Sequence, residues 1–136
     1  MTIVVDASLA IAWVFDDEGP PPLDVLRRIQ NEGAIVPSLW RLEVANVMRT
    51  AVLQGRYSEK FVSNSLTDLA RLPIVVDPDT DRHAWGQTRT LSRAYGITVY
   101  DAAYLELALR REIPLASCDI QLIKAARRIR VEVLAP

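Results

Sequence analysis

The sequence predicts a single α/β domain in which a parallel sheet is flanked by helices. Two observations lead to this fold class. Short apolar, β-branched runs recur along the 136 residues, and helical patterns separate them. Runs this short and this apolar are typical of parallel strands that are buried on both faces. No internal repeat, low-complexity tract or linker interrupts the pattern, so we expect one domain over residues 1–136.

The N-terminal part of the predicted fold begins with a strand over residues 2–5, the run Thr-Ile-Val-Val. The apolar stretch that follows predicts a helix over residues 9–15, with Ser8 as its expected N-cap. Residues 18–22, Glu-Gly-Pro-Pro-Pro, are typical of a stiff surface loop. A second helix is predicted over residues 23–31. Two helices therefore precede the return of the chain to the sheet.

The middle of the chain contributes two more strands, each an apolar run next to a proline. The first covers residues 34–36 and the second covers residues 74–76. Between them, Ser38 is expected to cap a long helix over residues 39–54. Ser58 is expected to cap a further helix that reaches about residue 72. This part of the chain is therefore predicted to form a strand, two helices and a strand.

The C-terminal part repeats the alternation. The predicted elements are a helix capped by Asp79 that reaches residue 95 and ends at Gly96, a helix over 100–111, a strand over 115–117, a helix over 119–128 and a strand over 131–134. In parallel α/β folds, ligands bind beyond the carboxyl ends of the strands. Functional residues are therefore expected just after the strands.

The charge balance and two rare residue types exclude several functions. The chain carries 17 acidic and 16 basic side chains, a net charge of −1, which excludes an overall basic nucleic-acid binder of the histone or ribosomal kind. Its single cysteine, Cys118, excludes an intramolecular disulfide and a cysteine-rich zinc site. Its single histidine, His83, excludes a histidine-based metal site, and we expect this residue on a helix surface.

Neither a signal segment nor a membrane helix is predicted. No basic N-terminal region leads into an apolar segment. The longest apolar runs fall far short of the ~18 residues that a membrane helix needs. We therefore expect a cytoplasmic protein that has no membrane partner.

Two acidic residues stand where the predicted fold favours neutral side chains. Asp6 ends the first strand, where its carboxylate would face the crevice above the sheet. Glu43 lies one helical turn from Leu39 and Val47, beside an apolar stripe. A buried carboxylate needs a partner, yet no arginine lies three or four positions from Glu43, whereas Asn46 shares its face. Both acids are therefore candidate site residues.

Two further acids begin helices. Asp101 is followed on its helix face by the core-like residues Tyr104 and Leu105, although a capping box that starts at Thr98 would also explain it. Asp119 opens the last helix, where N-capping would explain it equally well. Each acid has such a structural explanation by itself, but four of them in one small α/β domain favour a shared site.

The four carboxylates indicate a metal site if they converge. Like charges that lie close together repel, so either a proton or a cation must bind. Carboxylates without histidine or thiolate prefer hard ions, here one or two Mg²⁺ or Mn²⁺. Such ions favour phosphate oxygens as further ligands and activate water. The pattern therefore predicts metal-assisted hydrolysis of phosphodiesters.

Four segments, in order along the chain, resemble PIN domains and, more narrowly, the VapC-type toxins of type II toxin–antitoxin pairs. They are residues 4–8 (VVDAS), 37–46 (PSLWRLEVAN), 98–104 (TVYDAAY) and 117–119 (SCD). The resemblance covers essentially the whole chain. It implies a five-stranded parallel sheet that is flanked by helices and has the first strand at its centre.

The resemblance also implies roles for individual residues. The four acids would bind the metal and carry the catalysis: Asp6, Glu43, Asp101 and Asp119. Three polar residues would support the site: Ser8, Asn46 and Ser117. Ser117 stands where threonine is common, which leaves a hydroxyl available. Cys118 is expected to be incidental.

A substrate and partners follow from the same resemblance. The protein would be an endoribonuclease toxin that cleaves RNA and leaves a 5′-phosphate and a 3′-hydroxyl. A cognate antitoxin would cover the active site, and the toxin would be a homodimer. If metal neutralises four of the 17 acids, 13 remain against 16 bases, so the loaded protein would be mildly cationic.

Two other functions stay open. A PIN-fold binding module without catalysis would keep the same acids. An aspartyl-phosphate receiver or phosphatase is less well supported, because the first strand ends Asp6-Ala7-Ser8 without a second acid and no lysine follows a late strand. Outside the site, we expect Trp40 and Trp85 to lie in the core.

Overall fold

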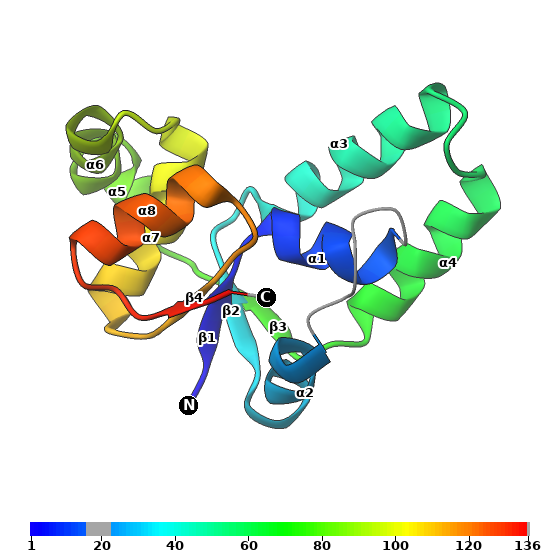
Figure 1. The fold of residues 1–136 in the computed structure, drawn as a ribbon, viewed down its shortest axis with the longest axis horizontal. Helices are drawn as coiled ribbons and strands as arrows, with labels where there is room; N and C mark the ends of the chain where they lie inside the picture. Colours follow the sequence, from blue (N-terminus) through cyan, green and yellow to red (C-terminus); the bar gives the residue numbers. More distant parts are fainter. Residues whose placement is uncertain (16–22, 136) are drawn as a thin grey trace.

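A parallel five-stranded sheet runs through the middle of the molecule, with helices on both of its faces (Figure 1). The computed structural model describes residues 1–15 and 23–135. The surface loop expected over residues 18–22 lies outside these ranges. The strands are β1 (Ile3–Val5), β2 (Ala34–Val36), β3 (Ile74–Val76), β4 (Leu115–Ala116) and β5 (Val133–Leu134). Their order is β3-β2-β1-β4-β5, so the predicted fold class and the central first strand are confirmed.

The helices divide between the two faces. They are α1 (Ala7–Val14), α2 (Leu23–Glu32), α3 (Trp40–Leu53), α4 (Glu59–Ala70), α5 (Thr80–Ala84), α6 (Gln87–Tyr95), α7 (Val99–Arg111) and α8 (Ile120–Arg128). In Figure 1, α1 to α4 lie on the right of the sheet and α5 to α8 on the left. Helix α1 packs against α3, while α7 packs on β1 and β4. No helix in the described part of the chain is long and apolar enough to span a membrane.

The order of the strands creates a switch point between β1 and β4. From β1 the chain adds β2 and then β3 on one side, and it afterwards returns to add β4 and β5 on the other side. All neighbouring pairs are parallel, so the carboxyl ends of the strands lie at one edge. In open α/β sheets, ligands bind in the crevice outside such a switch point. The residues that follow β1 and β4 are therefore the first to consider for function.

The centre of the sheet is anchored by complete burial. Ile3, Val4 and Val5 of β1 and Leu115 of β4 are all 0% exposed. Fully burying a side chain such as Val, Leu or Ile contributes roughly 1.5–3 kcal/mol. The two strands on either side of the switch point are therefore fixed in the core, and they position the residues that follow them.

Two of the expected helix starts were wrong. The N-cap of α1 is Asp6, whose carboxylate accepts from the amide of Leu9, and not Ser8. The helix begins at Ala7, so Ser8 already lies within its first turn. Helix α3 begins after Leu39, which makes no side-chain cap, and not after Ser38. The Ser38 amide instead donates to the Thr80 hydroxyl at 3.0 Å, because this residue belongs to the turn that leads into the helix.

The single helix expected over residues 79–95 was also wrong, because the structure divides it into α5 and α6. Gly86, with φ −102° and ψ −109°, leaves the helical region and separates the two. At this break Trp85 is 90% exposed, so its expected place in the core was wrong, whereas Trp40 is 4% exposed as expected. The caps expected at Ser58 and Asp119 are confirmed.

Candidate active site

All four acids singled out in the sequence line one cavity of about 410 Å³. Asp6 follows β1 and Asp119 follows Ser117 and Cys118 at the end of β4, so both lie at the switch point. Glu43 comes from α3 on one face of the sheet and Asp101 from the first turn of α7 on the other. The fold thus brings together four carboxylates from four different elements.

The Asp6 carboxylate is 4% exposed and is held on both of its oxygens. Its Oδ1 accepts from the Ser8 hydroxyl at 2.7 Å and from the Leu9 amide at 3.2 Å. Its Oδ2 accepts from the Ser117 hydroxyl at 2.7 Å. Burial raises the pKa of Asp6 from 3.8 to about 6, the hydrogen bonds act to lower it, and the charge of Asp119 adds to the rise. Asp6 is therefore a fixed carboxylate whose described hydrogen-bond donors are all neutral.

The two serine hydroxyls also connect Asp6 to the segment after β4. Ser8 Oγ accepts from the backbone amide of Cys118 at 3.0 Å. Ser117 Oγ accepts from the backbone amide of Asp119 at 2.9 Å. Each serine thus donates to Asp6 and accepts from a backbone amide of the segment that follows β4. Ser8 and Ser117 both lie beside Asp6, and their supporting role stays a prediction.

Glu43 has a partner that the sequence did not reveal. The Tyr104 hydroxyl donates a hydrogen bond to Glu43 Oε1. Partial burial raises the pKa of Glu43, and the charges of Asp101 and Asp6 raise it further, while the bond from Tyr104 acts to lower it. Tyr104 lies three residues after Asp101, and this spacing was the only sign that the tyrosine shares a helix face with a site acid.

Asp101 and Asp119 combine capping positions with a place in the cavity. The Asp101 amide donates to the Thr98 hydroxyl at 3.1 Å, which confirms the expected cap at the start of α7. Asp119 Oδ1 accepts from the Leu122 amide at 3.0 Å at the start of α8. Partial burial and then the charge of Asp119 raise the pKa of Asp101. Capping therefore explains where these helices begin but does not neutralise the carboxylates.

The charge of this cavity is unbalanced. Among the described residues, neither a lysine nor an arginine lines it. An all-oxygen set of carboxylates fits a hard divalent ion such as Mg²⁺ or Mn²⁺. In residues 1–15 and 23–135, no three Asp, Glu, His or Cys side chains form a ready-made ligand set. Because Mg²⁺ usually keeps several of its waters, the residues present fit a hydrated ion better than a closed protein cage.

Two other residues near the motifs lie differently with respect to the cavity. Asn46, expected to support the site, is exposed and is not among the residues that line the cavity. It lies three residues after Glu43, but the helix turns its side chain toward solvent. Cys118, expected to be incidental, does line the cavity.

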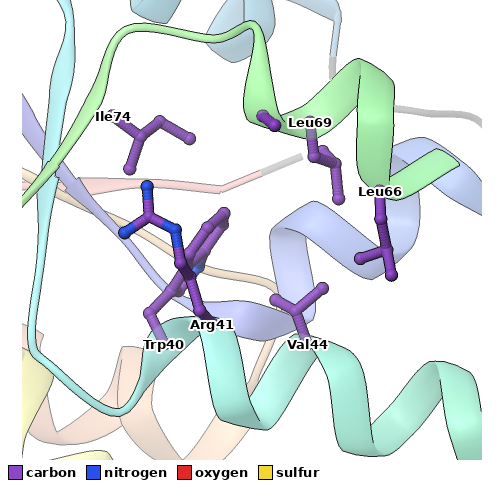
Figure 2. A pocket seen from close by; sticks show the side chains of 7 residues that line it. Trp40, Arg41, Val44, Leu66, Leu69 and Ile74 are labelled. Atoms are coloured by element: carbon purple, nitrogen blue, oxygen red, sulfur yellow. The ribbon is translucent and has the colours of Figure 1, made fainter. Parts of the chain in front are cut away.

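A second cavity, of about 210 Å³, lies between α3, α4 and β3 and differs in character. Figure 2 shows Trp40, Arg41 and Val44 of α3 facing Leu66 and Leu69 of α4. Its lining includes no carboxylate in the described part of the chain. Apart from Arg41 its described lining is apolar, and these residues offer no ligands for a metal ion.

Comparisons with known proteins agree with this architecture. The family model for the PIN domain matches residues 3–128. Ribonuclease VapC12 from two strains of Mycobacterium tuberculosis is 28% identical, over 98% of this chain and 99% of that protein. The crystal structure of PAE2754 from Pyrobaculum aerophilum has the same fold, with a TM-score of 0.67 at 18% identity, over 99% of this chain and 89% of the other. Because the family model covers most of the sequence, the chain belongs to the PIN domain family.

Proposed function

We propose that this protein is a metal-dependent endoribonuclease that acts as the toxin of a toxin–antitoxin pair. The observation that carries the proposal is the convergence of Asp6, Glu43, Asp101 and Asp119 in one cavity that no described cationic side chain lines. The similarity to Ribonuclease VapC12 over nearly the whole of both chains supports RNA as the substrate. An antitoxin partner, a homodimer, a cytoplasmic location and a single domain over residues 1–136 are parts of the same proposal.

The four acids would hold one or two Mg²⁺ or Mn²⁺ ions, with Asp119 binding directly or through water. When bound, such an ion supplies an activated water and neutralises charge that develops on the phosphate. The protein's part is to orient the carboxylates and to line the described cavity without a lysine or arginine that would compete with the metal ion. Ser8 and Ser117 orient Asp6 through neutral hydroxyls, which leaves its negative charge for the metal.

The central test measures RNA cleavage by the purified full chain in Mg²⁺ or Mn²⁺. We expect Asp6→Asn and Asp101→Asn to lower the rate at least about 100-fold, since loss of outer-shell partners alone commonly costs 10–100-fold. The matched control is Asp24→Asn, whose side chain is fully exposed on α2. It should cleave RNA like the wild type. Full activity in either site variant, or activity that survives EDTA, would contradict the proposed mechanism.

Two further measurements separate the alternatives. A titration that shows no Mn²⁺ binding, together with no cleavage, would favour a PIN-fold binding module. Labelling by acetyl phosphate would favour an aspartyl-phosphate protein, and we expect none. For the toxin role, expression should arrest growth, and co-expression of the product of a small adjoining reading frame should relieve the arrest. Growth that continues while the expressed protein cleaves RNA would separate the nuclease from the toxin role.

A further inference from the structure

The Tyr104 side chain connects the two helices that carry Glu43 and Asp101. It lies on α7, is 1% exposed, and donates its hydroxyl hydrogen to Glu43 Oε1 of α3, 61 positions earlier in the chain. Helix α3 packs mainly on α1 and α4, and α7 mainly on α5, α6, α8 and the sheet. Direct packing of α3 on α7 therefore contributes little to the position of Glu43 relative to Asp101. The hydrogen bond from Tyr104 supplies that connection.

Packing alone does not explain a tyrosine at this position. A buried hydroxyl that lacks a partner costs free energy, so phenylalanine would fill the same volume at lower risk. The hydroxyl is satisfied by a carboxylate that lines the cavity, and Tyr104 lines that cavity as well. The polar end of this side chain thus belongs to the site, while its ring belongs to the core.

A neutral donor is suited to orient a metal ligand. An arginine in the same place would neutralise Glu43 and compete with a cation, whereas a hydroxyl fixes one oxygen and leaves the charge. Burial, followed by the hydrogen bond and charge of Glu43, raises the pKa of Tyr104 well above its usual value, so the phenol keeps its proton. Ser8 and Ser117 hold Asp6 in the same way. Hydroxyl groups thus donate to both Asp6, which caps α1, and Glu43 of α3.

We propose that Tyr104 is a positioning residue, whose hydroxyl holds the Glu43 carboxylate in place relative to Asp6 and Asp101 and thereby sets the affinity of the site for a divalent ion. The inference rests on the proposed function, since it assigns a role within the same metal site. Its direct consequence concerns metal affinity rather than RNA binding.

Tyr104→Phe removes the hydroxyl and keeps the ring. Titration of the full chain with MnCl₂, followed by the EPR signal of free Mn²⁺, should show an affinity about 10-fold or more below that of the wild type. The Mn²⁺ concentration for half-maximal RNA cleavage should rise by a similar factor, while KM for RNA stays unchanged. The matched control is Tyr95→Phe, in a tyrosine of α6 that does not line the cavity. It should leave Mn²⁺ affinity unchanged.

A double-mutant cycle tests whether Tyr104 acts through Glu43. In the Glu43→Gln background the carboxylate that the hydroxyl positions is gone, so adding Tyr104→Phe should cause no further loss of Mn²⁺ affinity. A second loss as large as the first would show that Tyr104 acts independently of Glu43 and would overturn the inference. Should Tyr104→Phe fail to fold, Tyr104→Met, which fills space with an adaptable side chain, supplies the same comparison.

The two proposals fail in different ways. If the wild type binds Mn²⁺ and cleaves RNA, but Tyr104→Phe matches it in Mn²⁺ affinity, the role of Tyr104 is refuted and the proposed function stands. If the wild type neither binds Mn²⁺ nor cleaves RNA, the proposed function is refuted and the role of Tyr104 falls with it.

Discussion

Two groups of carboxylates in the described part of the molecule each include a buried aspartate, and the two groups differ in their partners. In the candidate active site, Asp6 accepts hydrogen bonds from two serine hydroxyls and a backbone amide. In the second group, Asp77 follows β3, and its fully buried carboxylate accepts from Arg110 Nη2 at 2.6 Å and from Arg111 Nη2 at 3.4 Å. The Arg110 guanidinium also donates through Nε to Glu106 Oε1 at 2.8 Å.

The pKa of the buried aspartate is shifted in opposite directions in the two groups. Burial alone would raise the pKa of Asp77, but the hydrogen bonds and charge of Arg110, together with hydrogen bonds from Arg111 and the Asp79 backbone, outweigh it and lower the pKa. The pKa of Asp6 rises to about 6 because burial is not offset by a cation. The distance between His83 Nδ1 and Glu106 Oε1 is 3.9 Å, and the His83 side chain is half-buried. The single histidine therefore lies beside the second group rather than on an open helix surface.

The comparison shows that position after a strand does not by itself identify a functional acid. Asp77 ends a parallel strand just as Asp6 does, at the same edge of the sheet. What separates them is the chemistry of the partner, a guanidinium in one case and hydroxyls in the other. A buried acid paired with arginine is neutralised within the fold, and removing either partner is costly, whereas an acid held by neutral donors carries a charge that an external cation could neutralise.

The largest expected effect comes from Asp77→Asn, which removes the buried charge that faces Arg110 and Arg111. We expect a loss of about 3 kcal/mol in the free energy of unfolding, because the substitution breaks a buried ion pair and leaves Arg110 with Glu106 as its remaining described acidic partner. Urea denaturation measures the loss, and Asp24→Asn is the exposed control. Mn²⁺ affinity in the folded variant should be unchanged. A loss below about 1 kcal/mol would contradict the structural role of this group.

The opposite sign is expected for Asp6→Asn in the metal-free protein. Here the substitution removes a buried charge that no cation compensates. We expect a gain of about 1–2 kcal/mol in the free energy of unfolding above pH 7 in EDTA, because burial of the charged form is unfavourable. The same variant should no longer be stabilised by added Mn²⁺. A destabilised Asp6→Asn under these conditions would show that the two groups of acids do not differ in the proposed way.

The pH dependence of the free energy of unfolding tests the same difference between Asp6 and Asp77. The pKa of Asp6 in the folded protein, about 6, exceeds its ordinary value of 3.8, so the folded state binds more protons between these values. Stability contributed by Asp6 is therefore lost as pH rises through this window, by up to about 1.4 kcal/mol per unit. In EDTA, the stability difference between Asp6→Asn and the wild type should widen from pH 4 to pH 6 and then level off. A stability difference that stays constant from pH 4 to pH 6 would show that Asp6 does not titrate in this range.

The smallest expected effect is that of Arg111→Gln. The Arg111 side chain is 44% exposed and lies at the edge of the second group, where solvent screens its interaction with Asp77. We expect a loss of about 0.5 kcal/mol, typical of an exposed pair. Urea denaturation beside Asp77→Asn measures it. A loss as large as that of Asp77→Asn would mean that Arg111, and not Arg110, is the main partner.

Much of this protein follows from the sequence by itself, because the signals are local. Apolar runs of three to five residues and the helical patterns between them are enough to predict the parallel sheet. Asp6, Glu43, Asp101 and Asp119 stand out because a charge is unusual at a strand end or beside an apolar stripe. Ser58, Gly96 and Asp119 end or begin helices through bonds within a few residues, and so these were predictable as well.

The tertiary structure alone decided the partners of Glu43 and Asp77, which lie far from them in the sequence. Tyr104 meets Glu43 across 61 positions, and Arg110 meets Asp77 across 33, distances over which no periodic pattern carries information. The break at Gly86 and the exposure of Trp85 likewise depend on how α5 and α6 pack. A neighbour within one or two turns is encoded by spacing, whereas a distant partner is selected by packing of the whole chain. The sequence therefore identifies the acids, and the fold determines which of them remain available to bind a cation.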